Sequence, residues 1–238
     1  MFFSFRLITS TFRAHQRISV GMTPEDFAAL TVDADIWEQD RHGPKVYHLA
    51  SGNILKIFRR KHVLSSAALT SYARHFCHNA ESLKWLAIPT VDIVDLFHLT
   101  CSRNTAVIYM PLPGRTVRQI AQEKALSAAF MHKLGSFIAH LHDKGIYFRS
   151  LHFGNVVLTA GNEFGLIDIA DMKCYSRPLP SRLRIRNFRH FLRLADDWKN
   201  VSAEAKRAVA AGYLETARLS QRAKKSMCKE VSVFGDAA

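Results

Sequence analysis

The chain has 238 residues, 48% of them apolar, which is enough to bury the core of one large domain or of two lobes. Its 33 Lys and Arg against 20 Asp and Glu give a formal net charge of +13, which favours anionic partners. This composition excludes disordered and collagen-like proteins, and no apolar run reaches the roughly 18 residues of a membrane span.

The cysteines are scattered along the chain and form no CxxC pair. This spacing predicts neither a disulfide framework nor a zinc site, and it favours a reducing, cytoplasmic compartment. The four residues are Cys77, Cys101, Cys174 and Cys228.

Residues 1–21 contain three arginines and no acidic residue, a composition that resembles a targeting peptide. Arg6 interrupts the apolar stretch, however, and no small-residue cleavage site follows it. The favoured alternative is that Met22 begins the chain, because Thr23 can cap a helix that carries acidic residues in its first turn. We therefore treat 1–21 as an N-terminal extension.

Strand-like runs dominate residues 22–110. They lie at 45–50, 53–58 and 105–110, and the Ser-Gly pair between the first two predicts a hairpin turn. A helix is expected at 72–86. This part of the chain predicts a small, strand-rich N-terminal lobe.

Helices dominate residues 111–238. Ser127 can cap a helix over 128–144, whose apolar residues form one stripe. A strand hairpin follows at 155–158 and 164–168, and further helices are expected at about 183–197 and 202–220. The fold class predicted is α+β, with two lobes.

Asn155 begins the first strand of the predicted hairpin, and Asp168 ends the second strand. An antiparallel pairing would bring them to one edge, where they offer oxygen ligands for Mg²⁺. The alternative for each residue is a local role, in which Asp168 caps a turn and Asn155 satisfies a loop.

Lys56 lies between apolar residues on a predicted strand. It is either a fixed cation for nucleotide phosphates or a lysine that snorkels from an edge strand. Glu81, on the next helix, is the acidic residue that would orient it.

This order of strand lysine, helix glutamate, long helix, loop asparagine and strand-terminal aspartate resembles the protein-kinase-like fold. The loop reads Phe148-Arg149-Ser150-Leu151-His152-Phe153-Gly154-Asn155, and the metal-binding triplet Asp168-Ile169-Ala170. The "LHFGN" portion is similar to sugar and small-molecule kinases. "HGPKVYHL", "KIFRRK" and "RIRNFRHFLRL" look like bacterial lipopolysaccharide-core kinases, especially the small "toluene tolerance"-type proteins related to Kdo and heptose kinases.

The resemblance implies ATP and Mg²⁺ as cofactors. Lys56 would hold the phosphates, Glu81 would orient Lys56, and Asn155 and Asp168 would bind the metal. A full glycine-rich phosphate loop is absent, so the cover over the phosphates would come from a shorter turn with Gly43 and Lys45.

Ser150 stands where the family pattern has the aspartate that accepts the acceptor's proton. Serine is no base at neutral pH, although phosphoryl transfer depends mostly on positioning and electrostatics. Two nearby residues could accept the proton in place of the aspartate, namely His152 and Asp171. An equal alternative is that His152 only orders the loop by hydrogen bonding. With Asp168, the catalytic candidates are Ser150 and His152, which would line the acceptor site.

Part of the positive charge is concentrated in one segment of the chain. Residues 177–193 contain six arginines and no acid, and a helix exposing them would bind anionic headgroups or a phosphorylated sugar-lipid. No nucleic-acid motif accompanies the charge, so no nucleic acid is expected, while a merely solvated face is the alternative. The membrane-facing arginines are Arg182, Arg184, Arg186, Arg189 and Arg193.

Three functions are weighed. The leading one is an ATP-dependent kinase that phosphorylates a sugar hydroxyl (heptose or Kdo) of the lipopolysaccharide inner core, in the cytoplasm and peripheral at the inner membrane. The second is a catalytically silent pseudokinase that binds a partner in envelope assembly. The third, an aminoglycoside- or choline-type kinase, is disfavoured because those enzymes normally keep the aspartate and have larger acceptor lobes.

Overall fold

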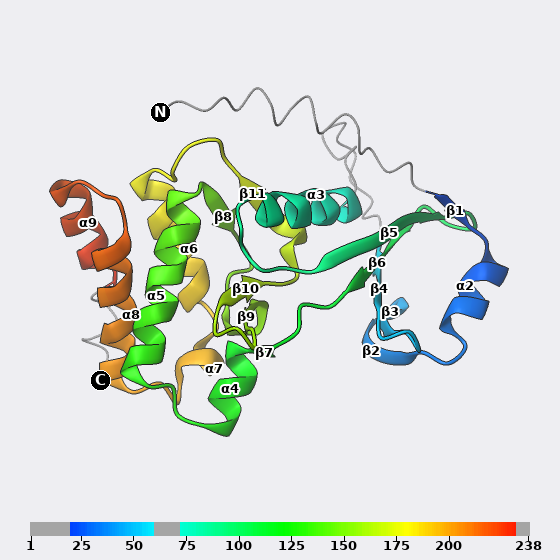
Figure 1. Ribbon diagram of the computed structural model, residues 1–238, viewed down its shortest axis with the longest axis horizontal. Coiled ribbons are helices and arrows are strands. Elements are labelled where there is room, and N and C mark those ends of the chain that lie inside the picture. Colours follow the sequence, from blue (N-terminus) through cyan, green and yellow to red (C-terminus); the bar gives the residue numbers. More distant parts are fainter. Residues whose placement is uncertain (1–19, 60–71, 232–238) are drawn as a thin grey trace. The chain divides into compact units, whose positions relative to one another are not determined.

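The computed structural model describes residues 20–59 and 72–231. The chain divides into two compact units (Figure 1). The strand-rich unit comprises Met1–Ala80 and Val91–Pro111, and the helical unit comprises Glu81–Thr90 and Leu112–Ala238. Most of the predicted N-terminal extension lies outside the described residues, and its last two residues belong to the first strand.

A six-stranded sheet in the order β1-β5-β6-β4-β3-β2 forms the strand-rich unit. Its neighbours pair antiparallel, except for β1, which runs parallel to β5. The strands are β1 (Val20–Met22), β2 (Asp35–Asp40), β3 (Gly43–His48), β4 (Ile54–Phe58), β5 (Asp92–Leu99) and β6 (Thr105–Met110).

The two faces of this sheet follow the period-2 alternation of β4. Leu55 and Ile57 are buried in a core cluster, against which Phe27 of helix α2 (Pro24–Thr31) packs. The other face carries Phe58, whose ring lies 5.6 Å from that of Phe76 in helix α3 (Tyr72–Trp85). Apolar burial on both faces therefore fixes the register of β4.

Helix α2 begins where the sequence predicts. The Thr23 side chain accepts a hydrogen bond from the Asp26 amide, and the Asp26 side chain accepts one from the Thr23 amide. This reciprocal capping box satisfies donors that the first helical turn leaves without partners.

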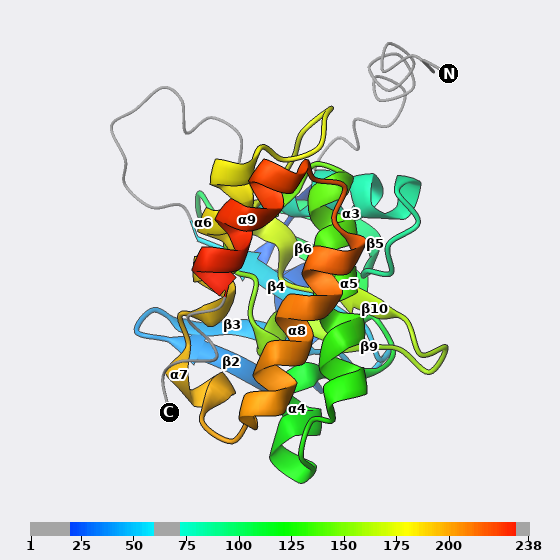
Figure 2. The ribbon, with the colours of Figure 1, turned by 90° about the vertical axis from the view of Figure 1, so that its left-hand side faces the viewer.

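Helices form most of the second unit. Helix α8 packs along α5, as Figures 1 and 2 both show. A Cβ added at Gly135 or Gly212 would collide with backbone of the facing helix, so glycine at both positions permits this close approach. The helices are α4 (Val117–Glu123), α5 (Ala128–Asp143), α6 (Ser181–Leu192), α7 (Ala195–Trp198), α8 (Ala203–Thr216) and α9 (Gln221–Val231).

Short strands and two 3-10 turns lie among these helices. They form a three-stranded sheet in the order β10-β9-β7 and a two-stranded sheet of β11 and β8. The segments are β7 (Arg115–Thr116), β8 (Ile146–Phe148), η3 (Phe153–Asn155), β9 (Val156–Leu158), β10 (Phe164–Leu166), η4 (Ile169–Asp171) and β11 (Met172–Cys174).

The predicted fold class is confirmed: this is an α+β chain with a strand-rich N-terminal part and a helical C-terminal part, in the element order of the protein-kinase-like fold. Helix α5 is capped by Ser127 as predicted and ends one residue earlier than expected. Strands β1, β2 and β5, which the prediction omits, complete the first sheet.

Two predicted helices are wrong in extent. The helix expected at 183–197 ends at Leu192, and the extended backbone of Leu194 precedes the separate helix α7. The helix expected at 202–220 ends at Thr216, where the chain turns and the Arg218 amide donates to Asp143 Oδ2 of α5 (3.1 Å). The second of these helices thus ends where a backbone amide bonds to another helix.

Candidate active site

The β9–β10 hairpin brings the two predicted metal ligands to one edge. Leu166 pairs with Val156, and beyond this pair the Ile167 amide donates to the Asn155 carbonyl (3.1 Å). Asp168 is the next residue along the chain. The hairpin register therefore places Asp168 beside the end of η3, whose last residue is Asn155.

Asn155 is buried, and its side chain ties the loop together. Its Nδ2 donates to the Ser150 carbonyl at 2.9 Å. Because this hydrogen bond uses the amide nitrogen, the amide oxygen Oδ1 lies on the other side of the side-chain amide. An amide oxygen is one of the ligand types that Mg²⁺ and Ca²⁺ accept.

Asp168 has a left-handed backbone, with φ 53° and ψ 44°. Few non-glycine residues adopt this conformation, aspartate more readily than most, and such residues cluster at functional sites. The residue is exposed, so its carboxylate can keep its hydration without a bound cation.

The donor set of this edge fits a magnesium ion. One carboxylate and one amide oxygen suit a hard cation that takes its remaining ligands from water and phosphate. Among the described residues, no group of three or more His, Cys, Asp or Glu side chains is arranged to hold a metal ion.

Ser150, where the sequence resemblance puts an aspartate, has a carboxylate as its partner. Strand β8 pairs antiparallel with β11, with Phe148 opposite Met172. The residues just after β8 therefore meet the residue just before β11. As a result, the Ser150 hydroxyl donates to Asp171 Oδ2 at 2.7 Å.

His152 has a role in ordering the loop. Its Nδ1 accepts a hydrogen bond from the Gly154 amide (3.1 Å) and caps the 3-10 turn η3. Burial, together with the nearby Arg118 guanidinium, lowers the pKa of His152. A neutral ring with Nδ1 already used as acceptor carries its proton on Nε2, so the geometry favours the loop-ordering alternative over a general base.

An arginine clamp, Arg118 with Asp197, holds the second half of the loop, and the sequence analysis missed it. Arg118 donates from Nε and Nη2 to the two carboxylate oxygens of Asp197 at 2.7 and 3.0 Å. Asp197 also accepts a hydrogen bond from the Phe153 amide (3.1 Å). The hydrogen bond between Asp197 and Arg118 raises the pKa of the Arg118 guanidinium. A Cβ at Gly154 would lie 2.6 Å from Arg118 Nη1, so this glycine makes room for the clamp.

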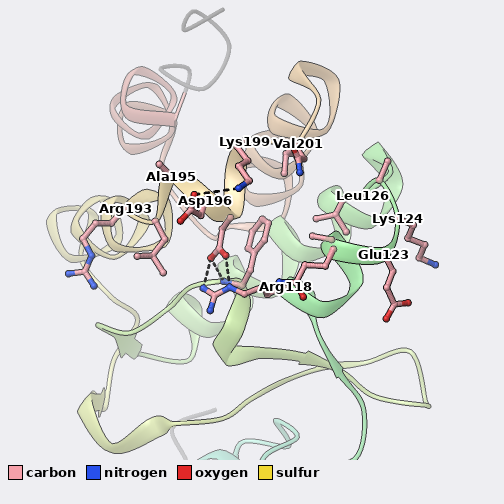
Figure 3. A pocket seen from close by; sticks show the side chains of 16 residues that line it. Arg118, Glu123, Lys124, Leu126, Arg193, Ala195, Asp196, Lys199 and Val201 are labelled. Carbon is pink, nitrogen blue, oxygen red and sulfur yellow. Dashed lines mark hydrogen bonds and ion pairs between the residues drawn. The ribbon is translucent and has the colours of Figure 1, made fainter. Parts of the chain in front are cut away.

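A cavity of about 940 Å³ lies beside this clamp, between α4 and the segment that contains α7. Figure 3 shows Arg118 between Arg193 and Lys124, which extend on opposite sides. Of the loop residues 148–155, Phe153 alone lines it. Ser150, Asn155 and Asp168 therefore lie outside this cavity.

A buried network, formed by His142, Asp143, Arg184, Asn187 and Tyr213, holds the first half of the loop. Asn187 accepts the Phe148 amide (3.1 Å) and donates to the Phe148 carbonyl (2.6 Å), which takes the place of a strand partner. His142 bonds to both Asn187 and Tyr213. Because these groups are buried and hydrogen-bonded, Phe148 has one defined position.

Lys56 occupies an interior strand. Strand β4 lies between β3 and β6, and Lys56 pairs with Val46 on one side and Val107 on the other. Only 7% of the residue is exposed, and its Nζ lies 5.8 Å from the centroid of the Phe58 ring. The alternative of a lysine that snorkels from an edge strand is therefore wrong.

The predicted phosphate-binding turn joins β2 and β3. Gly43 has φ 99°, a conformation that favours glycine, and Lys45 pairs with Glu38 across the hairpin at 2.7 Å. Arg59 donates to the carbonyls of Gly43 and Pro44 and so fixes the turn. A nucleotide phosphate would have to compete with Glu38 for Lys45.

Glu81 is exposed on α3. Lys56 belongs to the strand-rich unit, whereas Glu81, Asn155 and Asp168 belong to the helical unit. The expected pairing of Lys56 with Glu81, and the assembly of one site from both units, stay predictions.

Helix α6 exposes a basic stripe, defined here as Arg182, Arg186, Arg189 and Arg193. The prediction that Arg184 belongs to the same face is wrong. Arg184 is 1% exposed and donates to Asp143 (2.7 Å) and to the Leu179 carbonyl (2.7 Å), because it lies on the inner side of the helix. In the part of the chain that the structure describes, no helix is long and apolar enough to span a bilayer.

Comparisons with known proteins give structural likenesses only. No family model and no curated protein matches the chain. A 2.2 Å crystal structure of WbdD is 14% identical, with a TM-score of 0.48 over 84% of this chain and 46% of that chain. A co-crystal of WbdD with the kinase inhibitor LY294002 is 16% identical, with a TM-score of 0.45 over 82% and 44%.

A further structure, of the bifunctional kinase-methyltransferase WbdD, is 15% identical, with a TM-score of 0.43 over 82% of this chain and 42% of that one. The chain thus spans less than half the length of these structures. With TM-scores below 0.5, the likeness assigns this chain no activity, substrate or partner of WbdD.

Proposed function

We propose that this chain is an ATP- and Mg²⁺-dependent phosphotransferase that acts on a sugar hydroxyl, of heptose or Kdo, in the lipopolysaccharide inner core. The observation that carries the proposal is the β9–β10 hairpin. It brings Asn155 and the left-handed Asp168 to one edge, next to a loop whose backbone is fixed along most of its length. Phosphoryl transfer depends mainly on such positioned groups.

Each predicted residue has a role in this proposal. Asn155 Oδ1 and the Asp168 carboxylate would hold Mg²⁺, which supplies charge neutralisation to the phosphates when bound. Lys56 would bind nucleotide phosphates, because its place on an interior strand gives its ammonium a fixed position. The Gly43 turn with Lys45 would cover the phosphates, and Glu81 would orient Lys56.

The basic stripe of α6 supports an anionic substrate at a membrane surface. Its four arginines recur at spacings of four, three and four residues, so they share one side of the helix. Each exposed cation near an anionic bilayer contributes on the order of 1 kcal/mol. The proposed location is therefore the cytoplasm, with peripheral binding to the inner membrane.

Nucleotide binding tests the proposal most directly. Mg·ATP at 100 times its dissociation constant should stabilise the wild-type protein by about 2.7 kcal/mol in a thermal unfolding assay. Asp168→Ala should lose most of this gain. Glu163→Gln, an exposed change on the same hairpin, is the matched control and should retain it.

Phosphate transfer to purified lipopolysaccharide core tests the acceptor. The wild-type protein should transfer labelled phosphate from ATP, and Asp168→Ala should not. Equal incorporation by both proteins would refute the metal assignment, and no thermal shift with Mg·ATP would refute nucleotide binding.

A second candidate function is a catalytically silent pseudokinase that binds an envelope-assembly partner. The observation that favours it is Ser150 at the place of the expected aspartate. Under this alternative Mg·ATP would still stabilise the protein, but no transfer would occur to any sugar of the core.

A further inference from the structure

Asp171 is a half-buried residue whose carboxylate lies against Ser150. One of its oxygens, Oδ1, is buried with no hydrogen-bond partner, and the other accepts the Ser150 hydroxyl at 2.7 Å. Buried polar atoms are almost always paired, so a carboxylate with an unpaired oxygen requires a reason.

The fold places this carboxylate at the position of the missing base. The pairing of Phe148 with Met172 sets the end of β8 against the start of β11, and just beyond this pair Ser150 reaches Asp171. The neighbouring turn η4, which contributes Asp171, thus brings an acidic group to the loop. The separation along the chain is 21 residues.

Ser150 links this carboxylate to the loop. It is partly exposed and its hydroxyl donates to Asp171 Oδ2, so an acceptor that bonds to Ser150 Oγ would be one hydrogen bond away from the carboxylate. The loop holds this serine in place, because Asn155 binds its carbonyl.

We propose that Ser150 and Asp171 form a two-residue proton relay that replaces the single catalytic aspartate. This inference rests on the proposed function. The acceptor hydroxyl oxygen bonds to the γ-phosphorus of ATP while the bond from that phosphorus to the bridging oxygen breaks, and ADP leaves with the electron pair. The acceptor proton passes to Ser150 Oγ, and the serine proton passes to Asp171 Oδ2, which later releases it to water.

The decisive variant is Asp171→Asn. The asparagine Oδ1 can still accept the Ser150 hydrogen bond, so the local structure is kept while the site for the proton is lost. For transfer from Mg·ATP to purified lipopolysaccharide core, kcat should fall by about 100-fold or more. KM should change by less than about threefold, because no binding contact is removed.

A swap variant separates a relay from a structural bond. Ser150→Asp combined with Asp171→Asn restores one carboxylate at the position next to the acceptor and avoids two adjacent charges. It should recover at least about tenfold of the kcat lost by Asp171→Asn. Glu163→Gln controls for the loss of an exposed acidic side chain and should behave like wild type.

The outcomes are distinct. Wild-type kcat in Asp171→Asn, or no recovery in a folded swap variant, would overturn the relay. A wild-type protein that Mg·ATP stabilises but that transfers no phosphate would overturn it too. Absence of both stabilisation and transfer would overturn the proposed function itself.

Discussion

Two sets of polar groups hold the loop 148–155 in the helical unit, and they differ in burial. In the buried network, His142, Arg184, Asn187 and Tyr213 are at most 1% exposed. In the arginine clamp, the Arg118 side chain is 39% exposed, although that of its partner Asp197 is only 2% exposed. One set is closed to solvent, and the other lies half open beside a cavity.

This difference in burial predicts different roles for the buried network and the arginine clamp. Groups in the buried network have exchanged water for protein partners, so the loss of one partner leaves another charge or amide unsatisfied. In the clamp, an Arg118 guanidinium that leaves Asp197 can recover hydration, so displacing it costs less than breaking the buried network. We therefore expect the network to determine whether the unit folds and the clamp to determine where residues 153–154 lie.

Arg184→Ala should show the largest effect of the variants considered. It removes the partner of Asp143 and leaves the Leu179 carbonyl without its donor. Breaking a buried ion pair costs about 3–5 kcal/mol in the free energy of unfolding, measurable by urea denaturation. Arg182→Ala, on the exposed side of the same helix, should change that free energy by less than about 0.5 kcal/mol.

A double variant guards against a trivial loss of folding. Asp143→Ala combined with Arg184→Ala removes both charges, so it should be less destabilised than the sum of the single variants. Additive costs, or an equal cost for Arg182→Ala, would contradict the buried network.

The pH dependence of stability tests the same network. Burial lowers the pKa of His142 to about 3, and the Arg184 charge adds to this shift. The unfolded chain binds a proton at His142 near pH 6.5, while the folded chain does not, so stability falls as the pH falls below 6.5. From pH 7 to pH 5 the loss should be about 2 kcal/mol.

Urea denaturation at several pH values between 5 and 7 measures this loss, above the range where most carboxylates titrate. His142→Gln should flatten the dependence, although His152 and His190, whose pKa values burial also lowers, keep a part of it. His140→Gln, an exposed change on the same helix, should leave the slope as it is. An unchanged slope in His142→Gln would contradict the assignment.

Local patterns in the sequence predicted much of this fold. The Ser127 cap, the Thr23 cap and the β9–β10 hairpin depend on neighbouring residues, so a single sequence reveals them. The sequence also contains the signal for the buried position of Arg184, because Arg184 lies on the same side of the helix as Phe188 and Phe191. The prediction overlooked this spacing because it grouped Arg184 with the neighbouring arginines.

The contacts that shape the loop could not be predicted in the same way. Arg118 and Asp197 are 79 residues apart, and Asn187 lies 39 residues from Phe148. No local pattern encodes such pairings, since they depend on which helices pack together. Asp171 was a candidate substitute from the sequence, but its contact with Ser150 depends on the pairing of β8 with β11 and on the path of the chain beyond it.

The smallest effect concerns the arginine clamp and its glycine. Gly154→Ala would place a Cβ 2.6 Å from Arg118 Nη1, closer than real Cβ contacts, so the guanidinium would have to leave Asp197. We expect a loss of about 1–2 kcal/mol in the free energy of unfolding. Gly161→Ala, where the nearest atom would be 3.7 Å away, should cost less.

A double-mutant cycle decides whether this cost arises from the clamp. In an Arg118→Ala background the clash with the guanidinium is absent and only the 3.1 Å contact with His152 Cε1 remains, so Gly154→Ala should then cost less than about 0.5 kcal/mol. The coupling free energy should therefore be about 1 kcal/mol, measured by urea denaturation of the four proteins. An equal cost of Gly154→Ala in both backgrounds would mean that the glycine serves the backbone of the loop and not the passage of Arg118 to Asp197.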